Sequence, residues 1–430
     1  MKRYLLSLLF LIAVAFTQAQ NNPIKDTVLQ GLIRDAVNNF PRIRELEEQL
    51  RINDVREKII KSNYHPTVAA DADYRFQAPV PQIALGNGGE KFKFQPYHNV
   101  TGGVTLNQLV YDFGKTKSQL ERNKTEQAYT QDDIDNNKNA IAYQVMTVYY
   151  GIIFIDKAIT VQQDQVRTLK ENERIIESKI KNGDAIEYDL LNTRVRTSNA
   201  DNRLRELTGQ QENNFVTMKW LTGRDVKGTV AGNSLDDGIS LVTTVSDWKT
   251  TNPEAILIQR RMQLLELDRE LLLVNDRPSI YATANGGFRN GYPVNVDQVR
   301  PAGYAGIGMS IPIVSASRPK LQQKLVDVDL ETSRKSMVTL ESNINKDLQN
   351  VNQNYQTNLE KFNNSQVTVE TANKAFKLAQ TRYKEGLITN TELILVQIEV
   401  EEANLNALQY RYQALLDKIE SHKVVGTRLY

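Results

Sequence analysis

Residues 97–115, which read YHNVTGGVTLNQLVYDFGK, decide the fold. Side chains alternate along the first part of this stretch, with Val100, Gly102, Val104 and Leu106 on one face and Asn99, Thr101, Thr105 and Asn107 on the other. Period-two alternation predicts a β-strand with one apolar and one polar face. From about residue 113 the period changes, and an uninterrupted helical pattern of some 65 residues continues to residue 181. At about 1.5 Å per residue this helix would extend on the order of 100 Å, which no compact domain contains.

The same succession of a strand and a long helix occurs a second time. Matching segments occur in one order in both halves, at offsets that fall from about 212 to about 203 residues. The pairs are 39–43 with 251–255, 64–68 with 276–280, 103–106 with 308–311, and 181–183 with 384–386. Four anchors in the same order indicate a tandem duplication.

The duplication gives a set of expected boundaries. We expect a signal peptide at 1–19, a first repeat at 20–235, an intervening segment at 223–250 and a second repeat at 236–430. The first repeat is expected to contain a helix, strands at about 66–77 and 97–110, a long helix at about 113–181 and a helix at about 185–222. The second is expected to contain a helix at about 252–275, strands at about 278–290 and 302–313, and helices at about 319–384 and 388–424. Proline is absent between Tyr97 and Asn252 and after Pro319, which permits such long helices.

Composition excludes several classes of function. The chain has no cysteine, so disulfide frameworks, thiol nucleophiles and cysteine zinc sites are excluded. Its three histidines, at 65, 98 and 422, have no metal-binding spacing, and we expect no catalytic residue, cofactor or metal. The 53 basic and 51 acidic residues are dispersed, which leaves no basic field for nucleic acid. Basic Lys2 and Arg3, followed by an apolar run to Phe16, predict an exported chain; a retained membrane anchor is the alternative.

Four amphipathic strands raise a problem of closure. A water-soluble sandwich would show the same alternation, so the pattern alone leaves both environments open. The long helices favour a membrane reading, because their narrow apolar stripes and broad polar surfaces are typical of coiled coils or a helical tube wall. An open sheet edge cannot lie in lipid, and about eight strands are the practical minimum for a barrel. Three copies would supply 12 strands, so the sequence predicts a trimer if the apolar face meets lipid.

At this point the chain resembles the TolC-like outer-membrane efflux proteins over essentially its whole mature length. The resemblance rests on the duplicated halves, the helix breaks at 39–41 and 252–253, the junction 111–115, and the turns 181–183 and 382–386. The second junction, 315–319, departs from the pattern because it lacks a glycine. The resemblance implies a mainly α protein with membrane β structure: a homotrimeric 12-stranded β-barrel continuous with a long periplasmic α-helical barrel.

The function that the resemblance implies is a passive exit duct for efflux or secretion. Its implied partners are a periplasmic adaptor, an inner-membrane transporter of the RND, ABC or MFS type, and outer-membrane lipid. The segment near 223–250 resembles part of the family's equatorial collar; a flexible linker is the alternative. A soluble periplasmic coiled-coil adaptor is the rival reading, although adaptors have one hairpin where this chain has two. An enzyme is the third, and no convergent catalytic cluster supports it.

The resemblance also suggests which residues close the periplasmic entrance. Glu392 and Asp189 lie six residues after the turn glycines Gly386 and Gly183, where relatives carry acidic residues near the aperture. Three Glu392 carboxylates around a threefold axis would repel one another, raise their pKa and favour cations. Tyr383 and Asp189 are candidates for the contacts that hold the entrance shut, and the two glycines for the tight turns beside which an adaptor docks. The alternative for each acid is a solvated surface residue.

Overall fold

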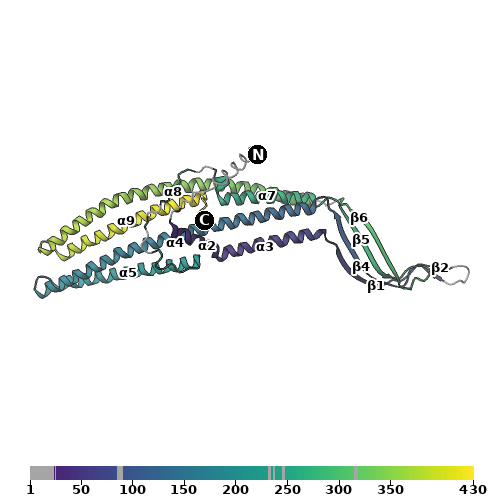
Figure 1. Ribbon diagram of the computed structural model, residues 1–430, viewed down its shortest axis with the longest axis horizontal. Helices are drawn as coiled ribbons and strands as arrows, with labels where there is room; N and C mark the ends of the chain where they lie inside the picture. The colour runs from purple at the N-terminus through teal and green to yellow at the C-terminus, as the bar shows by residue number, and fades with distance from the viewer. Residues whose placement is uncertain are drawn as a thin grey trace, which may run out of the picture. The chain divides into compact units, whose positions relative to one another are not determined.

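The computed structural model describes residues 24, 26–84, 91–230, 234–235, 238–244, 247–313 and 318–430. The expected signal peptide, 1–19, and residues 315–317 of the second junction lie outside this range. The longer elements, in chain order, are α2 (Thr27–Asn39), α3 (Pro41–Lys61), β1 (Thr67–Phe76), β4 (His98–Tyr111), α4 (Lys115–Lys181), α5 (Glu187–Thr222), α7 (Pro253–Val274), β5 (Ser279–Arg289), β6 (Arg300–Ser310), α8 (Arg318–Lys384) and α9 (Asn390–Val425) (Figure 1). The short ones are η1 (Ser62–Tyr64), β2 (Gln82–Ala84), β3 (Lys91–Lys93) and α6 (Trp248–Thr251). The chain is mainly helical.

The chain divides into two compact units, and each draws on both halves of the sequence. The helical unit comprises the described parts of Met1–Glu47, Asp132–Leu257 and Met337–Tyr430. The strand unit comprises those of Glu48–Gln131 and Ile258–Ser336. This division differs from the two expected tandem repeats, because each unit contains segments from both halves of the sequence.

In the strand unit, four antiparallel strands form one sheet in the order β1-β4-β5-β6. The register keeps apolar residues on one face, as in the pairs Tyr74 with Val100 and Leu106 with Ala284. The opposite face is polar, and there the Asn285 Nδ2 donates to Thr105 Oγ1 at 2.9 Å. The apolar face is open to the surroundings: large side chains on it, such as Ile307 at 80% exposure, are covered by nothing in the described chain.

The helices attached to these strands follow the strand order. Asn53 on α3 donates from Nδ2 to Thr130 Oγ1 on α4 at 3.0 Å. Arg122 on α4 pairs with Asp268 on α7 at 2.7 Å, and this contact raises the pKa of Arg122. α7 and α8 are joined by the pair Arg269 and Asp327 at 3.2 Å. The order is therefore α3-α4-α7-α8, so that neighbouring helices continue neighbouring strands.

In the helical unit, the apolar stripe of α4 forms the centre of the core. Val145, Tyr149 and Ile152 are almost fully buried. By length and composition α4 could cross a bilayer, but half of its apolar 18-residue stretch is buried inside the protein. The Tyr149 hydroxyl donates to Asp26 Oδ2, and Asp26 also caps the first turn of α2 by accepting from the Val28 N–H at 2.8 Å. The start of α2 is thereby anchored to the middle of α4.

The described residues between α5 and α7 pack against α9. Val230 and Ile239 are buried, and the Val242 N–H donates to Ser421 Oγ at 3.1 Å. The His422 Nε2 lies 2.9 Å from the Ser240 carbonyl oxygen. These contacts hold part of the segment 223–250 on the helices, which a freely flexible linker would not require.

One backbone approach in the sheet depends on glycine. Gly103 of β4 and Gly287 of β5 face each other in register, and a Cβ added at Gly287 would overlap the carbonyl oxygen of Gly102. Gly306 of β6 is the matched contrast, because a Cβ there meets nothing within 4 Å.

We expect Gly287→Ala to destabilise the sheet by about 1–3 kcal/mol, since overpacking forces backbone shifts. Gly306→Ala should change stability by less than about 0.5 kcal/mol, as surface substitutions away from special contacts usually do. Thermal unfolding of the detergent-solubilised protein, followed by the loss of heat-modifiable migration in gels, measures both. Equal midpoints for the two variants would contradict the close approach of β4 and β5.

Candidate functional site

Two turns of the same type join the long helices in the helical unit. In the first, Gly183 has φ +81°, the Asp184 N–H donates to the Lys179 carbonyl at 2.9 Å, and the Gly183 N–H donates to the Ile180 carbonyl at 3.1 Å. This pair of bonds is a Schellman motif, which ends a helix by placing glycine in the left-handed region.

The second turn repeats the first bond for bond. Gly386 has φ +75°, the Leu387 N–H donates to the Arg382 carbonyl at 2.8 Å, and the Gly386 N–H donates to the Tyr383 carbonyl at 3.1 Å. Both glycines thus have the positive φ expected of them, and the space around each would admit a side chain. Glycine is needed at these turns for backbone conformation rather than for room.

Glu392 lies in the first turn of α9 and completes its N-terminal cap. The Thr389 N–H donates to Glu392 Oε2 at 2.7 Å, while the Glu392 N–H donates to Thr389 Oγ1 at 3.2 Å. These two bonds form a capping box. The hydrogen bonds from Thr389, the backbone one first, hold the pKa of Glu392 below its ordinary value. The side chain is exposed and ionised in the single chain; a raised pKa in a ring of three chains stays a prediction.

Tyr383 and Asp189 lie near each other, although they come from different hairpins. Tyr383 is buried in a cluster with Ala379 and Leu393. The Lys179 Nζ lies 4.0 Å from the centre of its ring and donates to its carbonyl oxygen at 3.3 Å. Burial, followed by the negative charge of Asp189, raises the pKa of Tyr383. Lys179 of α4 therefore binds the last turn of α8.

Buried side-chain amides form further links between the two hairpins. The Asn172 Nδ2 on α4 donates to Asn390 Oδ1 at 2.8 Å, and the Asn390 Nδ2 donates to Thr193 Oγ1 on α5 at 2.9 Å. Two helical turns farther from the tip, which is the end of the helices at Gly183 and Gly386, the Gln397 Nε2 donates to Gln165 Oε1 at 3.0 Å. All five side chains are buried. We call this set the amide seam.

The sequence analysis did not single out the amide seam, although a signal for it exists. Gln165 and Asn172 are seven residues apart on α4, and Asn390 and Gln397 are seven apart on α9. Heptad spacing places each pair on one face of its helix. Because α4 and α9 are antiparallel, Asn172 then faces Asn390 and Gln165 faces Gln397. Amides at heptad positions of two apolar stripes would have indicated these contacts.

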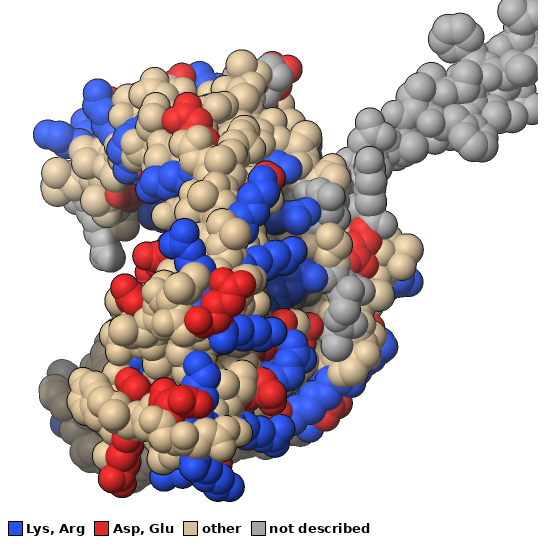
Figure 2. All heavy atoms as spheres, turned by 90° about the vertical axis from the view of Figure 1, so that its left-hand side faces the viewer, with Lys and Arg blue, Asp and Glu red and all other residues tan. Residues whose placement is uncertain are grey.

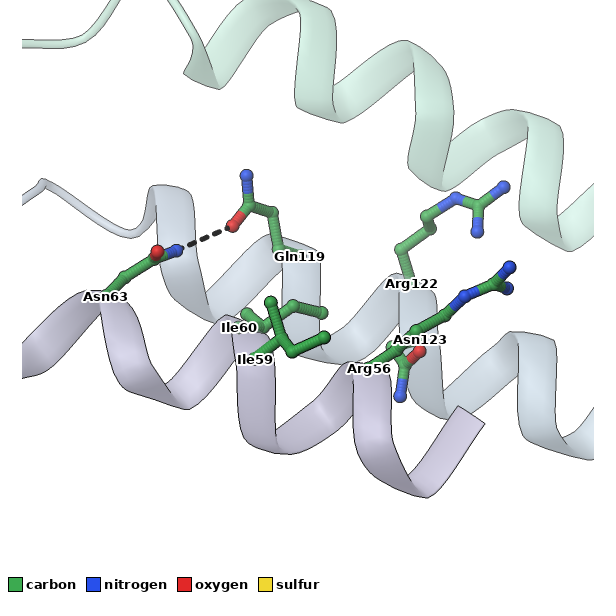
Figure 3. Close-up of a pocket in the computed structure, with 7 residues that line it drawn as sticks. All are labelled: Arg56, Ile59, Ile60, Asn63, Gln119, Arg122 and Asn123. Atoms are coloured by element: carbon green, nitrogen blue, oxygen red, sulfur yellow. Dashed lines mark hydrogen bonds between the residues drawn. The ribbon is translucent and has the colours of Figure 1, made fainter. Parts of the chain in front are cut away.

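Two cavities can be compared, one in each unit. One of about 100 Å³ lies between α4 and the α8–α9 hairpin, lined in part by Ile175, Lys179, Tyr383 and Leu393. The other, of about 400 Å³, lies in the strand unit and is lined by Arg56, Ile59, Ile60, Asn63, Gln119, Arg122 and Asn123 (Figure 3). Arg122 is already paired with acids, and the rim residue Ile59 is 61% exposed. This second cavity lies beside the exposed apolar residues Ile52, Val55 and Ile59 of α3.

The surface charges and the possible metal ligands of the described residues complete the account of the site. Basic and acidic side chains are interspersed on the face shown in Figure 2. Among the described residues, no group of three or more histidine or acidic side chains could hold a metal ion. What the geometry offers is a set of capped, hydrogen-bonded helix ends.

Comparison with known proteins identifies the class. The model of the outer membrane efflux protein family matches residues 32–224 and 274–426, which is most of the chain. The chain therefore belongs to the outer membrane efflux protein family. It is an outer-membrane efflux channel with a large periplasmic helical part, and a transport conduit rather than an enzyme. No curated protein matches the chain.

Solved structures share the fold at low sequence identity. Crystal structures of CusC align with TM-score 0.75 at 13% identity, over 94% of this chain and 93% of that one. The CmeC outer membrane channel of Campylobacter jejuni gives 0.71 at 15%, over 94% and 87%. The open-state MtrE outer membrane channel of Neisseria gonorrhoeae gives 0.71 at 15%, over 93% and 89%. The soluble-adaptor alternative receives no support. Channels of the family form trimers and work with adaptors and inner-membrane transporters.

The amide seam can be tested with Gln165 and Gln397. We expect Gln165→Leu and Gln397→Leu each to destabilise the helical unit by about 1–3 kcal/mol, because each leaves a buried amide without its partner. The double variant should recover most of this loss, since replacing both partners by apolar groups can be nearly neutral. Denaturant unfolding measures the coupling, and hydrogen exchange near 160–175 and 390–400 localises it. Strictly additive losses would show that the two amides do not interact.

Proposed function

We propose that three copies of this chain form one continuous duct through the outer membrane, gated at the helix tips. Four strands from each chain form a 12-stranded barrel in outer-membrane lipid, and the helices form a periplasmic tube. The duct is passive, so an inner-membrane transporter of the RND, ABC or MFS type supplies the energy and a periplasmic adaptor joins the two.

The observation that carries this proposal is the open sheet with an apolar face. Within the described chain, β1 pairs only with β4 and β6 only with β5, so each has an edge of unpaired backbone groups. Each unpaired N–H or C=O group costs about several kcal/mol in lipid. A sheet whose apolar face meets lipid avoids this cost only by closing into a barrel. One four-stranded sheet is too small to close alone.

The edge helices of the strand unit support the same closure. α3 exposes Ile52, Val55 and Ile59, and α8 exposes Leu321, Leu325 and Val328, all at 46% or more. These are the two outer helices in the order α3-α4-α7-α8, and each continues an edge strand. We propose that the stripe on α3 packs against the stripe on α8 of the next copy. In antiparallel register this pairs Ile59 with Leu321.

A tandem duplication accounts for the two identical tip turns. The Schellman bonds at Gly183 and Gly386 are the same, and an adaptor that recognises one turn can recognise the other. We propose that adaptor tips dock beside both glycines. The segment 223–250, packed on α9, then forms part of a collar around the tube.

The gate is proposed to consist of Glu392, Asp189 and Tyr383. Glu392 is exposed at the start of α9 and ionised in the single chain. Three such carboxylates around the axis would form a cation-favouring ring. Tyr383, which Lys179 contacts, and the nearby Asp189 would fix the closed position of the hairpins, and a partner that binds the open state more tightly would shift the equilibrium.

The subunit contact can be tested by cysteine cross-linking, because the natural chain contains no cysteine. We expect Ile59→Cys with Leu321→Cys to give disulfide-linked trimers on mild oxidation. A disulfide requires Cα atoms within about 7 Å of each other, and the proposed register places these two residues opposite each other. The control is Ile52→Cys with Leu321→Cys, which shifts the register by seven residues, or about 10 Å along the helix. Non-reducing gels of outer membranes report the result. Equal cross-linking of both pairs, or of neither, would reject this register.

The gate can be tested with Glu392→Gln, which removes the charge but keeps an amide that can complete the cap. We expect the cation-to-anion permeability ratio in planar bilayers to fall by roughly two- to tenfold. In the natural chain the ratio should fall as the pH drops through the pKa of the carboxylate ring, whereas the variant should show no such step. Glu331→Gln on α8 is the control for a lost surface charge. An unchanged ratio would remove Glu392 from the gate and leave the trimer standing.

A further inference from the structure

Two arginines face each other across the connection between β5 and β6. Arg289 is the last residue of β5 and Arg300 the first of β6, and the strand register pairs them directly. Both lie at one end of the sheet, and the helices α7 and α8 are attached at the other end. Directly opposed residues on one face have Cβ atoms about 5 Å apart, and like charges in such positions destabilise a sheet.

Both arginines lie on the polar face of the sheet. Alternation along β5 places Arg289 with Asn285 and Thr283, and alternation along β6 places Arg300 with Tyr304. This is the face that the Asn285 to Thr105 hydrogen bond marks as polar. In the barrel of the proposed function, on which this inference rests, the polar face lines the duct and this end is its outer mouth.

Neither guanidinium is neutralised within the described chain. Arg289 lies over the ring of Tyr292, with its Cζ 5.4 Å from the ring centre. Arg300 donates from Nη2 to Gln298 Oε1 at 3.1 Å and from Nε to the same oxygen at 3.3 Å. Asp297, in the same connection, is exposed, and neither arginine takes part in an ion pair among the described residues. The two side chains are positioned by uncharged partners and keep their full charge.

Arg75 provides an internal contrast. It lies near the same end of β1 and on the same face, but it is paired with Asp73 at 3.6 Å. The arginine pair at 289 and 300 has a repulsive cost and no compensating acid, which is the arrangement expected where an external anion supplies the missing charge.

We infer that Arg289 and Arg300 form a binding site for phosphate-type polyvalent anions at the outer mouth of the duct. A guanidinium presents a planar fork of donors that matches phosphate oxygens, and two forks side by side suit an anion with several such groups. Two arginines from each of three chains would line the mouth. An anion bound there would lie in the mouth of the duct, so polyvalent anions added from the outside would block it.

Binding is tested first, by calorimetric titration of the detergent-solubilised, full-length protein with inorganic tripolyphosphate. We expect Arg289→Gln with Arg300→Gln to weaken binding by roughly tenfold or more, because charge-assisted contacts to phosphate are lost. Each single variant should lose part of that affinity. Arg75→Gln is the matched control and should change affinity by less than about twofold. The double variant should show the heat-modifiable migration of the natural protein in gels, because it only removes a like-charge contact. This measurement verifies that the variant is folded.

Conductance then separates this inference from the proposed function. In planar bilayers, tripolyphosphate should block current at lower concentration from the side of the strand connections than from the side of the helix tips, and the double variant should lose this asymmetry. Wild-type affinity in the double variant, or an equal loss in Arg75→Gln, overturns the site. Binding that depends on both arginines in a protein without channel activity would support the site and reject the duct.

Discussion

Backbone hydrogen-bonding groups along the two outer edges of the four-stranded sheet constrain everything else in this protein. They lie beside an apolar face, and in lipid only a further strand could satisfy them. The same order of elements then continues into the helices, because α3, α4, α7 and α8 are attached to β1, β4, β5 and β6 and bonded in that sequence. In the proposed trimer, closure of the sheet and closure of the helical layer would therefore be one requirement.

The helices and strands were predictable because their periodicities are long and unbroken. The change from period two to a helical stripe near residue 113 places the start of α4 within two residues, and the absence of proline lets it continue to Lys181. The turn glycines were predictable for the same kind of reason, since a glycine between two helical patterns is the usual residue for positive φ. These are local properties, and local properties can be read from a sequence.

The rest depends on which distant segments meet. The amide seam joins Gln165 to Gln397 and Asn172 to Asn390, and only the pairing of α4 with α9 makes those residues neighbours. The opposition of Arg289 and Arg300 depends on strand register in the same way. Glu392 is a different case: Thr389-x-x-Glu392 could have been read as a capping box, but its place after Gly386 suggested a gate. The structure shows the cap, and the two roles are compatible.

The amide seam also determines how the tip hairpins can part. Apolar side chains hold α8 to α9 within a hairpin, around Tyr383 and Leu393, whereas the amide seam links one hairpin to the other. An amide that loses a protein partner gains water, so each such bond contributes only about 0.5–1.5 kcal/mol net. In the proposed gate, such a joint would define one closed position of the hairpins, would exchange its hydrogen bonds for water at small cost, and would leave the contacts within each hairpin unbroken when the hairpins part and return.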